Sequence, residues 1–488
     1  MNFFYKAFCR VFQAAFRAAL PVLPYREPQV VHACPALKSV LEKEKIRSVL
    51  VVTDRGIIGN GLVAPLEKVF TQSGVRLTIY ADTLPNPTVQ NVEDALKLYY
   101  SNHCTALIAI GGGSSVDCAK AVGARVAYPK RTVNQLGGKL KVWRKLPTLI
   151  AIPTTADTGS EATLAAMVTD ADTHHKYAIM SFPLIPHYAV LDAALTYSLP
   201  PHLTATTGMD ALTHAVEAYI GRSTTKETRA LALEATKLVF ENVERAYTDG
   251  NDHTARENML HAAYKAGIAF SKSYVGYIHA VAHSLGGRYG TPHGLANAVI
   301  MPYVLEAYGK CIHKKLHALA VAAGVATWED TPETAARNFI GAVKALNERM
   351  GIPTKLTGIQ KADVEALAKH AHREANPLYP VPRLMNAGEL ERFYNAVAER
   401  SEPMTIDEIL QKQRAFFQTG ATLPVQFRIA MLKKLREEGI GVEAVTFWGV
   451  TDADSWLTGF RRETSYPLLF DRARQAKEAY DTVMKAAE

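Results

Sequence analysis

Short runs of β-branched residues alternate with segments of helical periodicity between Ile46 and Asp192. The runs are SVLVVTD, RLTIYAD, CTALIAIGGGS, LPTLIAIPTT and HYAVLD, and segments such as LVAPLEKVFTQSG and VQNVEDALKLYYSN lie between them. Apolar runs of this kind are typical of strands buried on both faces, and helices supply the crossovers that parallel neighbours need. This stretch therefore predicts βαβ units and a parallel sheet.

Strand patterns disappear between about Thr204 and Ala396, where helical periodicity dominates. The chain has 488 residues, which is more than one core usually supports. We therefore predict an α/β domain followed by an all-helical domain. The expected parts are an amphipathic helix at 1–28, the α/β domain at 29–203, the helical domain at 204–397 and an appendage of undefined role at 398–488.

The amino-terminal segment carries phenylalanines on one helical face and polar residues on the other. The phenylalanines are Phe4, Phe8, Phe12 and Phe16, and the polar residues are Lys6, Arg10, Gln13 and Arg17. A basic amphipathic helix is compatible with a membrane surface or an organellar leader. We predict instead that the phenylalanine stripe docks on the chain's own body or on a second subunit.

Composition narrows the class of protein. The net charge is +8, but the sequence contains no zinc knuckle and no sustained Lys/Arg run, so we expect no nucleic-acid partner. Five widely spaced cysteines without a CxxC motif favour a reducing compartment and a cytoplasmic location. No run approaches the ~20 apolar residues of a spanning helix, so we expect no transmembrane segment.

Acidic and imidazole side chains gather in two helical segments. Asp210 and His214 are four residues apart in GMDALTHAVEAY and share one helix face. His279, His283 and His293 follow in HAVAHSLGGRYGTPHG. Oxygen and imidazole donors together suit Fe(II), Zn(II) or a similar divalent ion. The spacing alone leaves open which of the three later histidines are ligands.

A glycine-rich turn follows the strand ALIAI. Gly111, Gly112 and Gly113 stand just before a helix, where backbone N–H groups and the helix dipole favour a phosphate. The sequence is not G-x-G-x-x-G, so the usual dinucleotide fingerprint is absent. Asp54, at the end of the first strand, suits a ribose hydroxyl and would repel a 2′-phosphate, which favours NAD(H).

Four motifs together resemble the iron-containing (group III) alcohol dehydrogenase family over roughly residues 1–396. They are GGGSSVDCAK, IPTTADTGSEAT, GMDALTHAVEAY and HAVAHSLGG…PHGLANA. The resemblance implies a dehydroquinate synthase-like architecture, with an α/β nucleotide-binding domain before an all-helical metal domain.

The resemblance also implies residue roles. Asp210, His214, His279 and His293 would hold the metal, His283 would relay protons, and Phe270 would line the substrate pocket. The cofactor would be lined by Asn86, Gly111, Gly112, Gly113, Ser114, Asp117, Lys120, Thr154, Thr155, Thr158, Thr163 and Lys176, besides Asp54. One departure is Asp157, which stands where the family's TTAGT turn has glycine. We expect an energetic cost if that position needs a positive φ, and repulsion of the diphosphate.

The implied activity is the interconversion of a small primary alcohol and its aldehyde. The implied cofactors are NAD(H) and Fe(II), with Zn(II) as the alternative metal. The resemblance also implies a homodimer or larger homo-oligomer. A polyol or diol dehydrogenase of the lactaldehyde–propanediol type shares this scaffold. A metal hydrolase gains nothing from the glycine turn and Asp54, and a carbohydrate-active protein is suggested by the tail alone.

The tail contains two further likenesses. Residues near 406–436 resemble the amino-terminal helix of aldehyde dehydrogenases, and residues near 441–488 resemble the end of a family 10 xylanase barrel. Both fragments lack the catalytic residues of those families. We expect no xylan hydrolysis and no aldehyde oxidation, and we expect a chain ending near Glu399 to keep its activity.

Overall fold

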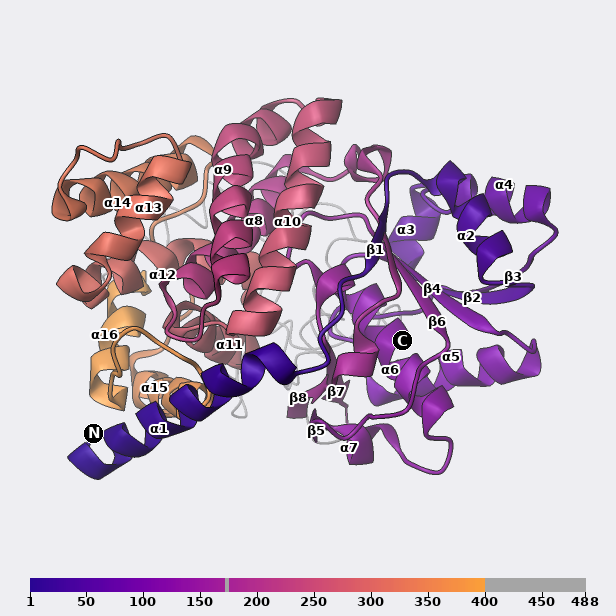
Figure 1. The fold of residues 1–488 in the computed structure, drawn as a ribbon, viewed down its shortest axis with the longest axis horizontal. Coiled ribbons are helices and arrows are strands. Elements are labelled where there is room, and N and C mark those ends of the chain that lie inside the picture. The colour runs from indigo at the N-terminus through magenta and orange to yellow at the C-terminus, as the bar shows by residue number, and fades with distance from the viewer. Residues whose placement is uncertain (172–174, 400–488) are drawn as a thin grey trace, which may run out of the picture. The chain divides into compact units, whose positions relative to one another are not determined.

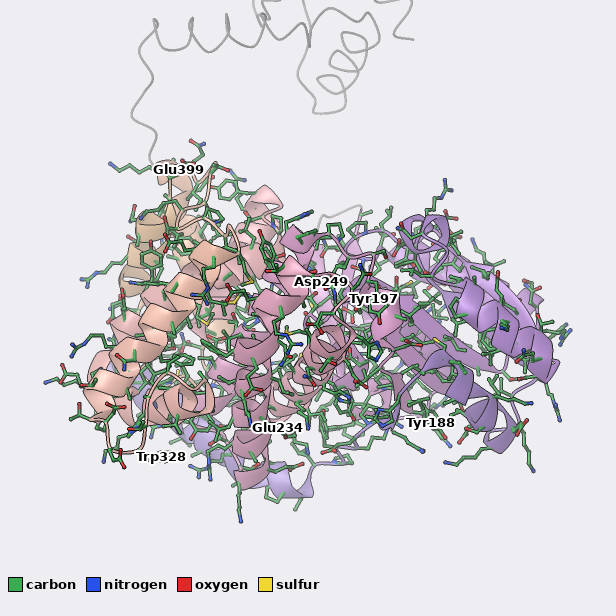
Figure 2. All side chains as sticks on the ribbon, turned by 90° about the horizontal axis from the view of Figure 1, so that it is seen from above. Tyr188, Tyr197, Glu234, Asp249, Trp328 and Glu399 are labelled. Atoms are coloured by element: carbon green, nitrogen blue, oxygen red, sulfur yellow. The ribbon has the colours of Figure 1, made fainter. Side chains whose placement is uncertain are left out.

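The computed structural model describes residues 1–171 and 175–399. The chain divides into two units, Met1–Glu399 and Arg400–Glu488. The second unit, with both predicted tail likenesses, lies outside the described residues. Figure 2 marks Glu399, where the description ends.

A six-stranded parallel sheet forms the core of the first half of the unit (Figure 1). Its order is β1 (Gln29–Val31), β9 (Tyr188–Val190), β6 (Thr148–Pro153), β4 (Ala106–Gly111), β2 (Ser48–Val52) and β3 (Arg76–Tyr80). Every pair in this sheet is parallel, which confirms the predicted sheet. In register, Gly111 at the end of β4 pairs with Pro153 at the end of β6, so the turns that follow both strands lie side by side.

Helices cover both faces of the sheet. They are α2 (Leu37–Lys43), α3 (Arg55–Gly59), α4 (Ala64–Ser73), α5 (Val89–Ser101), α6 (Gly113–Ala127) and α7 (Val133–Leu136). Alternate residues of β2 enter different cores: Leu50 and Val52 belong to one hydrophobic cluster, and Val49 and Val51 belong to the other. This two-sided burial explains the continuous apolar runs of the sequence.

A second, three-stranded sheet was not anticipated from the sequence. It consists of β5 (Gly138–Lys139), β8 (His175–Met180) and β7 (Ala165–Asp170), with β7 and β8 antiparallel. β5 precedes β6 in the chain, β7 and β8 follow it, and α6 packs against β7.

The second half of the unit is helical, as predicted. It contains α8 (Pro201–Ile220), α9 (Lys226–Thr248), α10 (His253–Ser273), α11 (Tyr277–Tyr289), α12 (His293–Tyr308), α13 (His313–Ala322), α14 (Pro332–Arg349), α15 (Val364–Ala375) and α16 (Ala387–Val397). From Gly208 to Ile220, α8 is buried on all sides, which makes it the central helix of this half. Within the described residues, no helix combines the length and apolar character needed to cross a bilayer.

The two halves meet where two glycines touch. Gly159, in the turn after β6, has φ +68°, and a Cβ there would lie 2.3 Å from the backbone oxygen of Ala263 on α10. A Cβ on Gly267, also on α10, would lie 2.7 Å from the oxygen of Gly159. Glycine is therefore required on both sides of this contact.

The amino-terminal helix α1 (Phe3–Ala19) docks through polar atoms. Arg10 donates to the backbone oxygens of Val381 and Pro382 at 2.8 and 3.0 Å, and Gln13 donates to Tyr379 at 2.8 Å. These contacts turn the polar side of α1 toward the body because they satisfy backbone carbonyls there.

The prediction placed the phenylalanine stripe on the chain's own body or on a second subunit. The first alternative is wrong for most of the stripe, and the second stays a prediction. Phe4, Phe8 and Phe12 are exposed. Phe16 alone among the four packs inward, with its ring centroid 5.1 Å from that of Tyr274.

Candidate metal centre and cofactor site

The central helix α8 presents a carboxylate and an imidazole to the same place. Asp210 and His214 are buried, and the Nδ1 of His214 lies 2.9 Å from the backbone oxygen of Asp210 and 3.3 Å from its Oδ2. Because α8 is helical through both positions, the i,i+4 spacing places the two side chains on the same face, as predicted.

Two more imidazoles arrive from the neighbouring helices. His279 lies in the first turn of α11, and its Nε2 is 3.8 Å from Asp210 Oδ1. His293 is the first residue of α12, and its Nε2 is 3.4 Å from the same oxygen. Four residues therefore each offer one ligand atom, and these atoms all lie within 4.8 Å of one another: Asp210, His214, His279 and His293.

The donor set fits a divalent metal. The Nε2 of His279 is buried and has no hydrogen-bond partner among the described residues, an arrangement that costs free energy unless an ion or another polar group occupies the space. Burial raises the pKa of Asp210, but His214 and the other imidazoles outweigh it and hold that pKa well below its usual range. Burial lowers the pKa of His293 to about 4, which leaves a neutral imidazole with a free lone pair.

A carboxylate missed by the sequence analysis orients His279. Glu217 Oε2 lies 2.7 Å from His279 Nδ1, and the two carboxylate oxygens also accept the backbone N–H groups of Gly276 and Ile278 at 2.7 and 2.8 Å. Glu217 is three residues beyond His214, so it shares that face of α8, and this spacing was the available signal. Burial raises the pKa of Glu217 to about 7.

Asn297 and Thr158 complete the hydrogen bonding of Asp210. Asn297 donates to Asp210 Oδ1 at 2.5 Å and lies 3.2 Å from His293 Nε2, one helical turn earlier on α12. Thr158, expected near the cofactor, donates its hydroxyl to Asp210 Oδ2 at 3.2 Å. Asn297 was also missed, although its i,i+4 spacing from His293 could have indicated it.

Asp157 lies beside the same carboxylate. Its φ is not positive, so the expected backbone cost does not arise; the turn's left-handed residue is Gly159. Burial, followed by the negative charge of Asp210, raises the pKa of Asp157 well above its ordinary value. A raised pKa favours the neutral carboxyl of Asp157, and the effect of this side chain on a bound diphosphate stays a prediction.

His283 stands apart from the four clustered donors. Its Nδ1 lies 2.6 Å from Glu374 Oε1, and the Tyr379 hydroxyl donates to the same oxygen at 2.7 Å. Burial lowers the pKa of His283, but the charge of Glu374 outweighs it and raises that pKa overall. The His283 ring stacks on His293 with 5.2 Å between centroids. Glu374 and Tyr379 have no sequence motif that would have indicated them.

Phe270 packs against the cluster from α10. Its ring centroid lies 4.1 Å from that of His214 at an interplanar angle of 36°. Phe270 is half-buried, so part of its ring remains open beside the four donors.

The glycine turn opens the sheet edge to a ligand. Gly111 has φ +144°, and a Cβ there would lie 2.6 Å from Ser115 Oγ, so glycine is required. At Gly112 and Gly113 a Cβ would meet nothing closer than 3.7 and 4.0 Å, which leaves the start of α6 uncovered. No side chain caps this helix, so its first N–H groups are available to an anion.

Several predicted cofactor residues border this turn. Thr155 provides the nearest atom to the Cβ position of Gly112, and Asp54 Oδ2 lies 3.5 Å from that of Gly111. Ser114 Oγ accepts the N–H of Asn86 at 3.2 Å, and Lys176 donates to Asn86 Oδ1 at 2.5 Å.

Asp54 also begins a helix. Its Oδ1 accepts the N–H of Ile57 at 3.0 Å, which caps the amino terminus of α3.

Lys120 and Asp117 are engaged with protein instead. Lys120 is buried and donates to Thr163 Oγ1, Thr163 O and Ala165 O at 2.8, 2.9 and 2.8 Å. Asp117 accepts from Ser160 Oγ at 2.7 Å and from Met167 N at 2.9 Å. Burial lowers the pKa of Lys120 to about 8.

Thr154 is buried, and its N–H donates to Gly111 O at 3.0 Å. Thr154, Thr163, Asp117 and Lys120 thus hold the turns in place.

Family comparisons agree with this arrangement. The "Iron-containing alcohol dehydrogenase" model matches residues 29–193, and the "Fe-containing alcohol dehydrogenase family, C-terminal" model matches residues 204–398. The "Glycosyl hydrolase family 10" model matches residues 397–486, in agreement with the expected xylanase likeness. The aldehyde dehydrogenase likeness stays a prediction.

Individual proteins give the same result. The chain is 39% identical over 339 residues to "Alcohol dehydrogenase 4" of Saccharomyces cerevisiae (strain YJM789), covering 69% of this chain and 87% of that protein. It is 35% identical over 352 residues to "1,3-propanediol dehydrogenase" of Klebsiella pneumoniae, covering 71% and 90%. The solved "Alcohol dehydrogenase from Oenococcus oeni" superposes with a TM-score of 0.73 and 30% identity over 77% of this chain and 100% of that one. The chain belongs to the iron-containing alcohol dehydrogenase family.

Proposed function

We propose that the chain interconverts a small primary alcohol and its aldehyde with NAD(H), using a divalent metal, Fe(II), held by Asp210, His214, His279 and His293. The observation that carries the proposal is the convergence of these four buried or half-buried donors beside an uncovered glycine turn. The balanced reaction is R-CH2-OH + NAD⁺ giving R-CHO + NADH + H⁺. When bound, the metal supplies a Lewis acid that polarises the substrate oxygen. Zn(II) suits the same donors.

Cofactor binding would begin at the uncovered start of α6. The N–H groups after Gly112 donate hydrogen bonds to the pyrophosphate, and Asp54 accepts hydrogen bonds from ribose hydroxyls. Lys120 and Asp117 position the neighbouring turn by their hydrogen bonds to residues 160–167. Asn86, Ser114, Thr155 and Lys176 line the rim.

The reaction proton would pass through His283. Glu374 holds His283 Nδ1, so the other ring nitrogen is free to take up or deliver the proton. Phe270 covers His214 with an apolar ring and limits the access of water to the substrate carbon.

Two alternative functions can be compared with this proposal. A diol dehydrogenase remains the nearest alternative, because a relative named for 1,3-propanediol shares the scaffold. A metal hydrolase leaves the glycine turn and Asp54 without a role. We further propose the domain boundaries 1–28, 29–203, 204–397 and 398–488, a cytoplasmic location and a homo-oligomer.

One experiment separates these assignments. Purified protein is chelated, reloaded anaerobically with Fe(II) or Zn(II), and supplied with ethanol, butanol or 1,3-propanediol while NADH absorbance is recorded. We expect chelation to abolish NADH formation and Fe(II) to restore it. Full activity with Zn(II) and no response to Fe(II) would overturn the iron assignment, and no NADH with any alcohol would overturn the function.

A further inference from the structure

A second group of metal-type donors lies away from the candidate active site. His32 follows β1 directly, and Glu257 and His261 lie one turn apart on α10. Each offers one ligand atom, and these atoms lie within 4.8 Å of one another. The rings of His32 and His261 are 5.9 Å apart between centroids.

The three side chains are not committed elsewhere. Within residues 1–171 and 175–399, none of them takes part in a hydrogen bond or an ion pair, which leaves their lone pairs available. Nearby, Lys265 is paired with Glu234 at 2.9 Å, and Figure 2 labels Glu234 on the adjacent α9.

We propose that His32, Glu257 and His261 bind a Zn²⁺ ion. Two imidazoles and one carboxylate are a usual zinc donor set, and exposed His32 leaves the fourth position to water. Ligands about 2.0–2.2 Å from zinc stand roughly 3.3 Å apart in a tetrahedron, so small side-chain rotations close the site. The ion would act as a clamp, because it would join the residue that follows β1 to α10. Tyr264 already ties these parts by donating to Pro28 O at 2.8 Å.

This site is separate from the catalytic one. His261 precedes Phe270 by nine residues on α10, which corresponds to about 13 Å along the helix axis at 1.5 Å per residue. The two ions can therefore be removed independently by substitution.

Zinc stoichiometry tests the proposal. Full-length protein and the Asp210→Asn variant, which lacks the catalytic carboxylate, are dialysed against micromolar Zn²⁺ and analysed by mass spectrometry of the metal. In each of these two backgrounds, we expect the protein with His32 and His261 intact to bind one more zinc ion per chain than its His32→Gln or His261→Gln variant. Added zinc should raise the Tm of the intact protein by about 2 °C or more. His253→Gln, elsewhere on α10, is the matched control and should bind as the parent does.

Equal zinc content and equal Tm in the parent and in His261→Gln would overturn the site. If only the four-donor site failed to bind metal, the parent would hold a single ion. His261→Gln would lose that ion, and Asp210→Asn would keep it.

Discussion

The Nδ1 of His279 lies 2.7 Å from Oε2 of Glu217, a carboxylate 62 residues earlier in the chain. Because Nδ1 faces this carboxylate, it carries the proton, and the lone pair of Nε2 is directed toward Asp210. The same carboxylate accepts two backbone N–H groups at the start of α11. Glu217 therefore fixes both the position of the helix and the tautomer of its histidine.

Replacing Glu217 by Gln should weaken metal binding 10- to 100-fold, because the amide loses the charge that orients His279. Metal affinity is measured by competition with a chromogenic chelator, with circular dichroism to verify folding. Glu234→Gln, which removes a surface carboxylate, serves as the control. An unchanged affinity in Glu217→Gln would show that the carboxylate has only a structural role.

His293 and His283 should respond differently to alanine. His293→Ala removes one of the four clustered donors, so metal content and activity should fall together. His283→Ala leaves the cluster intact, so metal content should persist while kcat drops by 10²- to 10⁴-fold. Metal analysis and steady-state kinetics on the same samples check both. The assignment is reversed if His283→Ala loses the metal and His293→Ala keeps it.

Asp54→Asn should raise the use of NADP(H) relative to NAD(H), because the substitution removes the charge that opposes a 2′-phosphate. Asparagine caps helices as well as aspartate, so the hydrogen bond to Ile57 and the stability of α3 should survive. The measurement is the ratio of kcat/KM for the two cofactors. A wild-type preference for NADPH would show that Asp54 does not contact the ribose.

Gly267→Ala should destabilise the protein by about 1–3 kcal/mol or prevent folding, because the new Cβ would meet the backbone of Gly159 at 2.7 Å. Gly341→Ala, in the middle of α14 with nothing within 4 Å, should instead be neutral or stabilising by up to about 1 kcal/mol. Denaturant unfolding of the pair tests the contact. Similar free energies of unfolding for both variants would mean that the halves can separate at this point.

His187 should make stability decline in mild acid. Its Nδ1 accepts the N–H of Leu149 at 3.1 Å, and burial lowers its pKa to about 4. Between pH 6.5 and 4 the unfolded chain therefore binds a proton that the folded chain does not, so this contribution is complete above pH 6.5 and is lost as the pH falls toward 4. His187→Asn keeps an acceptor but does not titrate. Between pH 7 and pH 5, wild type should lose about 1 kcal/mol more than this variant in urea unfolding. Parallel losses would assign the acid sensitivity to other groups.

The sequence revealed those parts of the site whose signal is local. Asp210 and His214 are one helical turn apart, and Gly111 to Gly113 follow a strand that the apolar sequence pattern predicts. Glu374 could not be recognised, because its importance arises only when α15 brings it to His283. The docking of α1 through its polar side was not anticipated for a similar reason: Arg10 donates to carbonyls 371 and 372 residues away, and helical periodicity carries no information about them. Backbone polar groups thus overrode the hydrophobic pattern.

The contact between Gly159 and Gly267 limits how such an enzyme can diversify. Backbone lies against backbone there, so no exchange of side chains can widen or narrow the gap between the halves. New substrates must therefore be accommodated by residues that project beside this joint, such as Phe270, three positions further along the same helix. Under the proposed assignment of Phe270 to the substrate pocket, variation in that ring changes which alcohol fits, while the spacing between hydride donor and acceptor is inherited unchanged.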